Sequence, residues 1–292
     1  MSSIEKYIDK LEKQSSAPVA DRTPAPDTQQ RAKPIAASTD QSTDQSTNSS
    51  KVVQVNLQKL ARIGALIPAE KNSKIVEEYR AIKRPLIKKA FNPTPIDMPN
   101  SNLIMVTSTT PDEGKTFNAI NLAMSIVMEM DYTVLLIEAD FARPAVTKYM
   151  GIEGIEKGLV DYLLGEESDV ANLIFRTNIP KLSVMAAGQS QAGTTELISS
   201  ERMKSFTQEL AQRYPDRIVI IDSPPLLVSN DAAVLSSLAG QVVLIIESGK
   251  TAQSAVKEAI EHLDENRITG VVLNKHLGNA GKEYGYYNKE ES

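Results

Sequence analysis

The stretch IMVTSTTPDEGKTF, residues 104–117, decides the fold of this 292-residue chain. An apolar run, Leu103–Val106, enters a short polar turn that ends in Gly114-Lys115-Thr116, and a helix-like run follows. The first turn of a helix leaves N–H donors unpaired, and the helix dipole favours an anion there. The segment therefore predicts a phosphate-binding loop, in which Lys115 reaches nucleotide phosphates and the Thr116 hydroxyl binds Mg²⁺.

The loop departs from the full GxxxxGK[ST] pattern at its first position, which is Thr109. A strand, turn and helix without a ligand is the alternative interpretation. Two further segments favour the nucleotide: TVLLIEAD at Thr133–Asp140 and RIVIIDSPP at Arg217–Pro225. Each is an apolar run that ends in a carboxylate, as expected of a central parallel strand that ends at a ligand site.

Asp140 and Asp222 are the carboxylates at these two strand ends. Aspartate at such a position is often only a helix cap, which is the alternative for either residue alone. Mg²⁺ takes one or two carboxylates together with phosphate oxygens and water. Two such residues beside a phosphate loop therefore predict a site for Mg²⁺ and a nucleotide.

Strand and helix signals alternate from Leu103 onward, which predicts an α/β fold: a P-loop NTPase-type, mostly parallel sheet with helices on both faces. The core is expected to span residues 101–277. Its expected strands are Leu103–Thr107, Thr133–Glu138, Leu182–Ala186, Arg217–Ile221, Val242–Glu247 and Gly270–Leu273. Its expected helices are Lys115–Met130, Pro144–Met150, Leu159–Leu164, Ser200–Arg213, Asp231–Leu238 and Thr251–Glu265.

The segments before the core differ in composition. Residues 1–14 read as a short amphipathic helix, and residues 15–50, rich in Ser, Thr, Gln and Pro, as a disordered linker. Residues 51–100 form an ordered lead-in with a helix at 73–91, in which Pro85 predicts a kink or a boundary.

The tail, residues 278–292, is polar and is expected to be mobile. It nevertheless carries Tyr284, Tyr286 and Tyr287, three of the nine tyrosines. These rings either pack on the core or are accessible phenols that are modified.

The whole-chain composition bounds the function. The formal net charge is −5 and the sequence pI about 5.3, so no basic field favours nucleic acid. There are no cysteines, and no apolar run approaches the length that spans a bilayer. We expect a cytoplasmic protein that reaches the inner membrane only through a partner.

Taken together, these motifs resemble those of the bacterial tyrosine kinases, and most closely the autokinases associated with the exosortase system. TPDEGKT (Thr110–Thr116), LLIEAD (Leu135–Asp140) and VIIDSPP (Val219–Pro225) look like the family's Walker A, A′ and B segments. GLVDYLLG, ELISS and GVVLNK match further family segments. The resemblance implies a Mg²⁺- and ATP-dependent tyrosine autokinase that regulates exopolysaccharide or capsule polymerisation and export.

The resemblance also implies roles for individual residues. Lys115, Glu138, Asp140 and Asp222 would be catalytic, with Glu138 near the attacking phenol, and Thr116, Asp140 and Asp222 would hold the metal. Tyr284, Tyr286 and Tyr287 would be phosphorylated in trans, and Glu77, Arg80 and Lys83 would build a ring-shaped homo-oligomer. The nucleotide would contact Thr110, Pro111, Asp112, Glu113, Gly114, Lys115, Thr116, Phe117 and Asn274, and Asn274 lies at a position that can touch the adenine.

The implied partners are a membrane activator of the polysaccharide co-polymerase type and a cognate tyrosine phosphatase. The sequence departs from the family pattern at four positions. Asp112 stands at a usual glycine, Glu138 at an aspartate, Ala142 at a frequent arginine, and Lys83 at an arginine.

Two rival functions remain open. A partitioning ATPase of the MinD/ParA-like class usually has a second lysine five residues before the loop lysine, where this chain has Thr110. A non-catalytic nucleotide-binding adaptor of the same export system is favoured by Asp112, Glu138 and Ala142.

Overall fold

The computed structural model describes residues 52–69, 73–92, 99–189, 194–213 and 216–276. The predicted helix at 1–14, the linker at 15–50 and the tail with Tyr284, Tyr286 and Tyr287 lie outside these residues, so those expectations remain predictions.

An eight-stranded sheet forms the centre of the described chain, in the order β1-β4-β5-β3-β6-β2-β7-β8. Neighbouring strands are parallel except for β4 and β5, which pair antiparallel. The strands are β1 Val52–Val53, β2 Leu103–Ser108, β3 Thr133–Glu138, β4 Phe175–Thr177, β5 Leu182–Met185, β6 Arg217–Asp222, β7 Gln241–Glu247 and β8 Ile268–Asn274.

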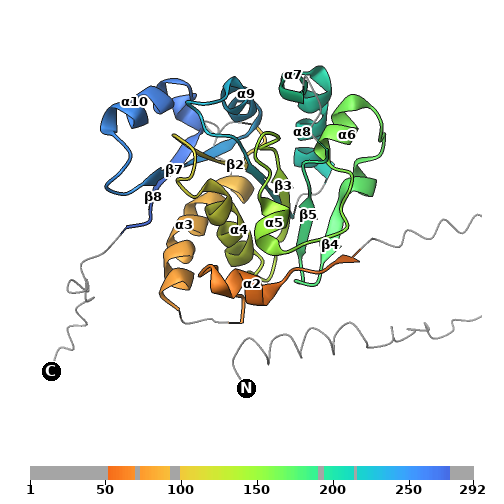
Figure 1. Ribbon diagram of the computed structural model, residues 1–292, viewed down its shortest axis with the longest axis horizontal. Coiled ribbons are helices and arrows are strands. Elements are labelled where there is room, and N and C mark those ends of the chain that lie inside the picture. Colours follow the sequence, from red (N-terminus) through yellow and green to blue (C-terminus); the bar gives the residue numbers. More distant parts are fainter. Residues whose placement is uncertain (1–51, 70–72, 93–98, 190–193, 214–215, 277–292) are drawn as a thin grey trace, which may run out of the picture.

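Helices cover both faces of the sheet (Figure 1). One face carries α2 Leu57–Arg62, α3 Lys74–Phe91, α4 Lys115–Ile126 and α5 Val146–Met150. The other carries α6 Leu159–Leu164, α7 Thr194–Ile198, α8 Glu201–Arg213, α9 Asn230–Leu238 and α10 Gln253–Glu261, with 3₁₀ turns at η1 Val170–Leu173 and η2 Glu265–Arg267. This arrangement confirms the predicted α/β fold class.

The strands divide the interior into two cores because successive side chains of a strand point to opposite faces. In β2, Ile104 and Val106 join the core beneath α3 and α4, and Leu103 and Met105 join the other core. Every residue of β2 is buried. Burial on both faces explains why the central strands read as continuous apolar runs rather than alternating ones.

The lead-in belongs to the same packed unit. Leu60 and Leu66 are fully buried in the core beneath α3 and α4, and β1 pairs with β4 at the sheet edge. The helix α3 runs through Pro85 without a break, so the boundary, one of the two alternatives predicted there, is wrong, and the kink stays a prediction. Burial of Tyr79 and Leu86 on either side of Pro85 holds the helix together across the missing N–H.

Two predicted helices end earlier than expected. The helix α4 stops at Ile126 rather than Met130, and α10 stops at Glu261 rather than Glu265. Asp264 then caps a separate 3₁₀ turn by accepting from the N–H of Asn266. The strands β1 and β4 and the helix α7 were not predicted, because elements of two to five residues carry no periodicity to read.

Candidate functional site

The segment between β2 and α4 is a tight loop at the carboxyl end of the sheet. Gly114 precedes the helix with φ 98°, in the left-handed region, and a Cβ there would lie 2.1 Å from Asn274 Nδ2. Only glycine fits this position. Asp112 has φ 65°, which costs an aspartate less than most residues but still favours glycine.

Lys115 is paired with a carboxylate of the neighbouring Walker A′ segment. Its Nζ lies 2.7 Å from Asp140 Oδ2, and the two side chains are 11% and 3% exposed. Burial by itself would lower the pKa of Lys115, but the charges of Asp222 and Asp140 outweigh it and the pKa is raised. The ammonium group is therefore a fixed cation at the start of α4.

Thr116 and Asp222 form the second contact across the site. The Thr116 hydroxyl donates to Asp222 Oδ2 at 2.7 Å, while Oδ1 of this fully buried carboxylate has no hydrogen-bond partner among the described residues. Burial raises the pKa of Asp222 to about 7, against the opposing effects of Lys115 and Thr116. A buried and incompletely satisfied carboxylate is the chemistry expected of a cation ligand.

Glu138 lies next to Asp222 in the register of β3 and β6 but faces the backbone instead. Its Oε1 accepts from the N–H of Val146 at 2.5 Å, and the side chain is buried. Burial raises the pKa of Glu138 although this N–H bond opposes the shift. Glu138 is absent from the residues that line the cavity described next, so its role as proton acceptor stays a prediction.

A cavity of about 850 Å³ opens beside the loop. The polar part of its lining includes Lys115, Thr116 and Asp140. The apolar part of its lining includes Phe141, next to Asp140, and residues from other parts of the chain, namely Ile63, Tyr149, Ile198 and Val228. The loop residues Pro111, Asp112, Gly114 and Phe117 also line it, as do Asn274 and Lys275.

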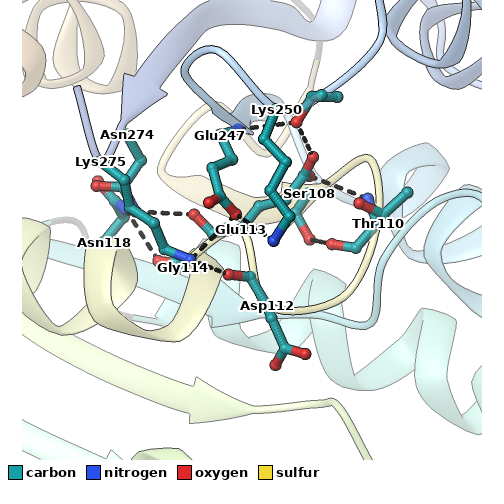
Figure 2. Close-up of polar contacts among 11 residues, drawn as sticks. Ser108, Thr110, Asp112, Glu113, Gly114, Asn118, Glu247, Lys250, Asn274 and Lys275 are labelled. Carbon is teal, nitrogen blue, oxygen red and sulfur yellow. Dashed lines mark hydrogen bonds and ion pairs between the residues drawn. The ribbon is translucent and has the colours of Figure 1, made fainter. Parts of the chain in front are cut away.

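The side chains of Glu113 and Asn274 form hydrogen bonds that stabilise the loop. Glu113 is 2% exposed and accepts from Thr110 N at 2.9 Å and from the Thr251 hydroxyl. Asn274 Nδ2 donates to the Glu113 carbonyl oxygen at 2.7 Å (Figure 2). The predicted nucleotide residues are thus brought together, but the Glu113 carboxylate faces Thr251.

Three residues of this loop environment were not singled out from the sequence: Asn118, Thr251 and Lys275. Asn118 follows Gly114 at i+4 in the helix, and its Nδ2 donates to the Gly114 carbonyl at 2.9 Å. Lys275 follows Asn274 in the GVVLNK segment, and that position was the available signal. No pattern in the sequence points to Thr251.

The predicted oligomerisation residues lie on α3 but face different ways. Glu77 and Arg80 form an ion pair at the surface. Lys83 is buried, and its Nζ lies 2.6 Å from the Ser125 carbonyl oxygen and 2.7 Å from Glu129 Oε1. The Lys83 ammonium is therefore used within the subunit, and the ring contacts stay a prediction.

These features define a P-loop nucleotide-binding protein. A strand leads through a glycine loop into a helix that begins with Lys115 and Thr116, and the carboxylates of Asp140 and Asp222 lie at the ends of two neighbouring strands. A sequence model of the AAA domain family matches residues 101–278. This match covers β2 to β8 and thus every predicted nucleotide- and metal-binding residue, while Ile63 of the cavity wall lies outside it.

Similarity to known proteins shows which kind of P-loop protein this is. The tyrosine-protein kinase YwqD of Bacillus subtilis is 34% identical over 191 residues, which cover 65% of this chain and 78% of YwqD. The tyrosine-protein kinase wzc of Salmonella typhimurium is 30% identical, over 65% of this chain but only 26% of wzc. The solved kinase domain of the Escherichia coli tyrosine kinase ETK is 30% identical, with a TM-score of 0.61 over 73% of this chain and 80% of that domain. The chain belongs to the family of bacterial tyrosine-protein kinases.

Within the described residues, we found no helix that is both long and apolar enough to cross a membrane.

Proposed function

We propose that this chain is an ATP-dependent protein-tyrosine autokinase that uses Mg²⁺ and phosphorylates the tyrosines of its own C-terminal segment in trans. The observation that carries the proposal is the convergence of Lys115, Thr116 and Asp222 at the amino end of α4. The kinase relatives supply the reaction type.

The residues fit a magnesium ion. Asp222 Oδ1 is buried and has no hydrogen-bond partner in the part of the chain that the structure describes, and Thr116 donates to the other oxygen of the same carboxylate. Mg²⁺ keeps waters and phosphate oxygens as ligands, so one or two protein oxygens are enough to hold it. When bound, Mg²⁺ would neutralise charge on the β- and γ-phosphates.

Lys115 would exchange partners on nucleotide binding. Its ammonium now pairs with Asp140, and a triphosphate at the amino end of α4 would offer it a stronger anionic partner. Asp140 would remain oriented, because its Oδ1 also accepts from the Arg143 N–H at 3.0 Å. Asp140 would then be released to face the reacting groups.

The apolar part of the cavity suits a phenol ring from Tyr284, Tyr286 or Tyr287 of a neighbouring subunit. The phenol oxygen would form a bond to the γ-phosphorus while the bond from that phosphorus to the β–γ bridging oxygen breaks, releasing ADP. The phenol proton would pass to a carboxylate. Asp140 lines the cavity, whereas Glu138 would first have to leave the Val146 N–H.

The resemblance extends the proposal to a cytoplasmic ring of subunits that controls exopolysaccharide or capsule polymerisation and export. Such a ring would sit at the inner membrane through an activator of the polysaccharide co-polymerase type, and a tyrosine phosphatase would reverse the modification. Each phosphate adds about −1.5 to −2 charge to a tail that already carries acidic residues. Repulsion between tails would then open the ring.

The test is incubation of the full chain with Mg·ATP, with and without a cytoplasmic segment of such an activator, followed by mapping of phosphate. We expect label on Tyr284, Tyr286 or Tyr287 and none in K115M. ATP binding without phosphotyrosine or ADP, even with the activator, would instead indicate the non-catalytic adaptor.

A further inference from the structure

Three successive carbonyl oxygens of the phosphate loop each accept a hydrogen bond from a side-chain nitrogen, and we call them the loop carbonyls. The bonds are Lys275 Nζ to Asp112 O at 2.6 Å, Asn274 Nδ2 to Glu113 O at 2.7 Å, and Asn118 Nδ2 to Gly114 O at 2.9 Å. Asn118 comes from α4, Asn274 ends β8 and Lys275 follows it, and Figure 2 shows all three on the same side of the loop.

Holding the loop carbonyls fixes where the loop N–H groups point. In a trans peptide the C=O and the N–H point in opposite directions, and the described chain contains no cis peptide. The N–H groups of residues 113–115 must therefore face away from the three donors. Asp112 and Gly114 have positive φ and Glu113 between them does not, an alternation that curves successive N–H groups into an anion-binding concavity.

The donors are themselves oriented by further contacts. Asn118 Oδ1 accepts from the buried Tyr79 hydroxyl at 2.8 Å, which turns Nδ2 toward Gly114. Lys275 also pairs with Glu247 Oε2 at 3.1 Å. The loop is thus held in one shape by α3, α4, β7 and β8 before any ligand arrives.

We propose that Asn118, Asn274 and Lys275 are positioning residues that preset the loop to receive the polyphosphate of the nucleotide. The identity of the ligand rests on the proposed function, whereas the role of the three side chains goes beyond it. It assigns to Asn274 an effect on phosphate binding, in place of the contact with adenine that the resemblance implies. Loss of Asn274 or Lys275 removes the side-chain donor of the Glu113 or Asp112 carbonyl, whose negative end can then turn toward the anion. The Gly114 carbonyl also accepts from the Asn118 N–H at 2.9 Å, so the Asn118 side chain adds a second donor there.

The experiment compares Mg·ATP with inorganic Mg·tripolyphosphate in calorimetric titrations of the full chain. The variants N274A and K275M should lower the affinity for both ligands by the same factor, about tenfold. This is the effect expected when one hydrogen bond to a polar partner is lost. K275R, which keeps a cationic donor, should recover most of the affinity. A contact with adenine would instead weaken ATP alone in N274A, and that result would overturn the assignment of Asn274.

The matched control is K250M. Lys250 pairs with the same Glu247 carboxylate, at 3.3 Å, but donates to none of the three loop carbonyls, and its side chain is 72% exposed. Its loss removes the same charge and should leave both affinities unchanged. Equal weakening in K250M and K275M would mean that net charge alone acts, which contradicts the proposal.

The outcomes separate this inference from the proposed function. A wild-type chain that binds ATP but not tripolyphosphate, or variants that bind both ligands like the wild type, would overturn the positioning role alone. A wild-type chain that binds neither ligand would remove the nucleotide function and the inference together. Lys275 is 45% exposed, so K275M tests the proposal even if N274A fails to fold.

Discussion

Lys83 Nζ lies 2.6 Å from the carbonyl oxygen of Ser125, so the ammonium group of this α3 residue donates a hydrogen bond to the carboxyl end of α4. The last carbonyls of a helix lack partners, and the negative end of its dipole favours a cation. Tyr79 of the same helix reaches Asn118 near the other end of α4. The helix that begins at the phosphate loop is therefore fastened to α3 near both ends.

The substitution K83M should destabilise the chain by about 1–3 kcal/mol, because it leaves the Ser125 carbonyl unpaired in a buried place. Urea unfolding measures this difference. K88M, at an exposed position of the same helix, is the matched control and should change the free energy of unfolding by less than about 0.5 kcal/mol.

A contact between subunits through Lys83 would give the opposite pattern. Size-exclusion chromatography would then show a smaller assembly for K83M while the free energy of unfolding stayed unchanged. Of the three predicted oligomerisation residues, Glu77 and Arg80 are at the surface and available to a neighbour.

The substitution Y79F should weaken ATP binding about threefold, because the Asn118 amide loses the partner that orients it toward Gly114. Fluorescence titration with a labelled nucleotide measures the change. The control is Y132F, which keeps the ring that stacks on Phe91 at 4.4 Å and should bind like the wild type. Equal affinity for ATP in Y79F and the wild type would show that the Asn118 amide is oriented without the Tyr79 hydroxyl.

The central sheet could be predicted because its strands carry a local signal. Burial on both faces produces continuous apolar runs in β2, β3 and β6, and parallel strands end at one edge. The register that sets Glu138 beside Asp222 follows from that geometry. The sequence alone therefore predicted that Lys115, Thr116 and Asp222 lie close together.

The support of the loop could not be predicted, because it joins residues far apart in the chain. Lys275 and Asp112 are separated by 163 positions, and no periodicity connects them. The contact of the Lys83 side chain with α4 could not be predicted for a similar reason. A lysine near the apolar side of a helix reads as a surface residue until the carboxyl end of α4 is known to lie against it.

The stability of the nucleotide-free chain should fall as the pH rises from about 4 to 7. The folded pKa of Asp222 is about 7, above that of a free aspartate, so the folded state holds a proton that the unfolded state has already lost over this range. Above pH 7 this contribution is constant. Thermal unfolding across the pH range measures the slope.

The substitution D222N removes this titrating group and should reduce that slope to the smaller part that the raised pKa of Glu138 contributes, while raising stability at pH 8 by a few kcal/mol, by the order of magnitude of the pKa shift. It should also abolish the dependence of nucleotide binding on Mg²⁺. A slope that persists undiminished in D222N would assign the pH dependence to another group.

Transfer between subunits is tested by mixing two chains, neither of which can phosphorylate its own tail. One carries K115M with an intact tail, and the other has an intact site with Tyr284, Tyr286 and Tyr287 changed to Phe. Neither should become labelled alone, and the mixture should place phosphate on the K115M chain, since its tail enters the site of the other. Both chains should fold like the wild type, and the triple variant should bind ATP like it, because its substitutions lie outside residues 101–276. Label that stays absent in the mixture with the activator present, while the unmodified chain becomes labelled, would show that each site acts only on its own tail.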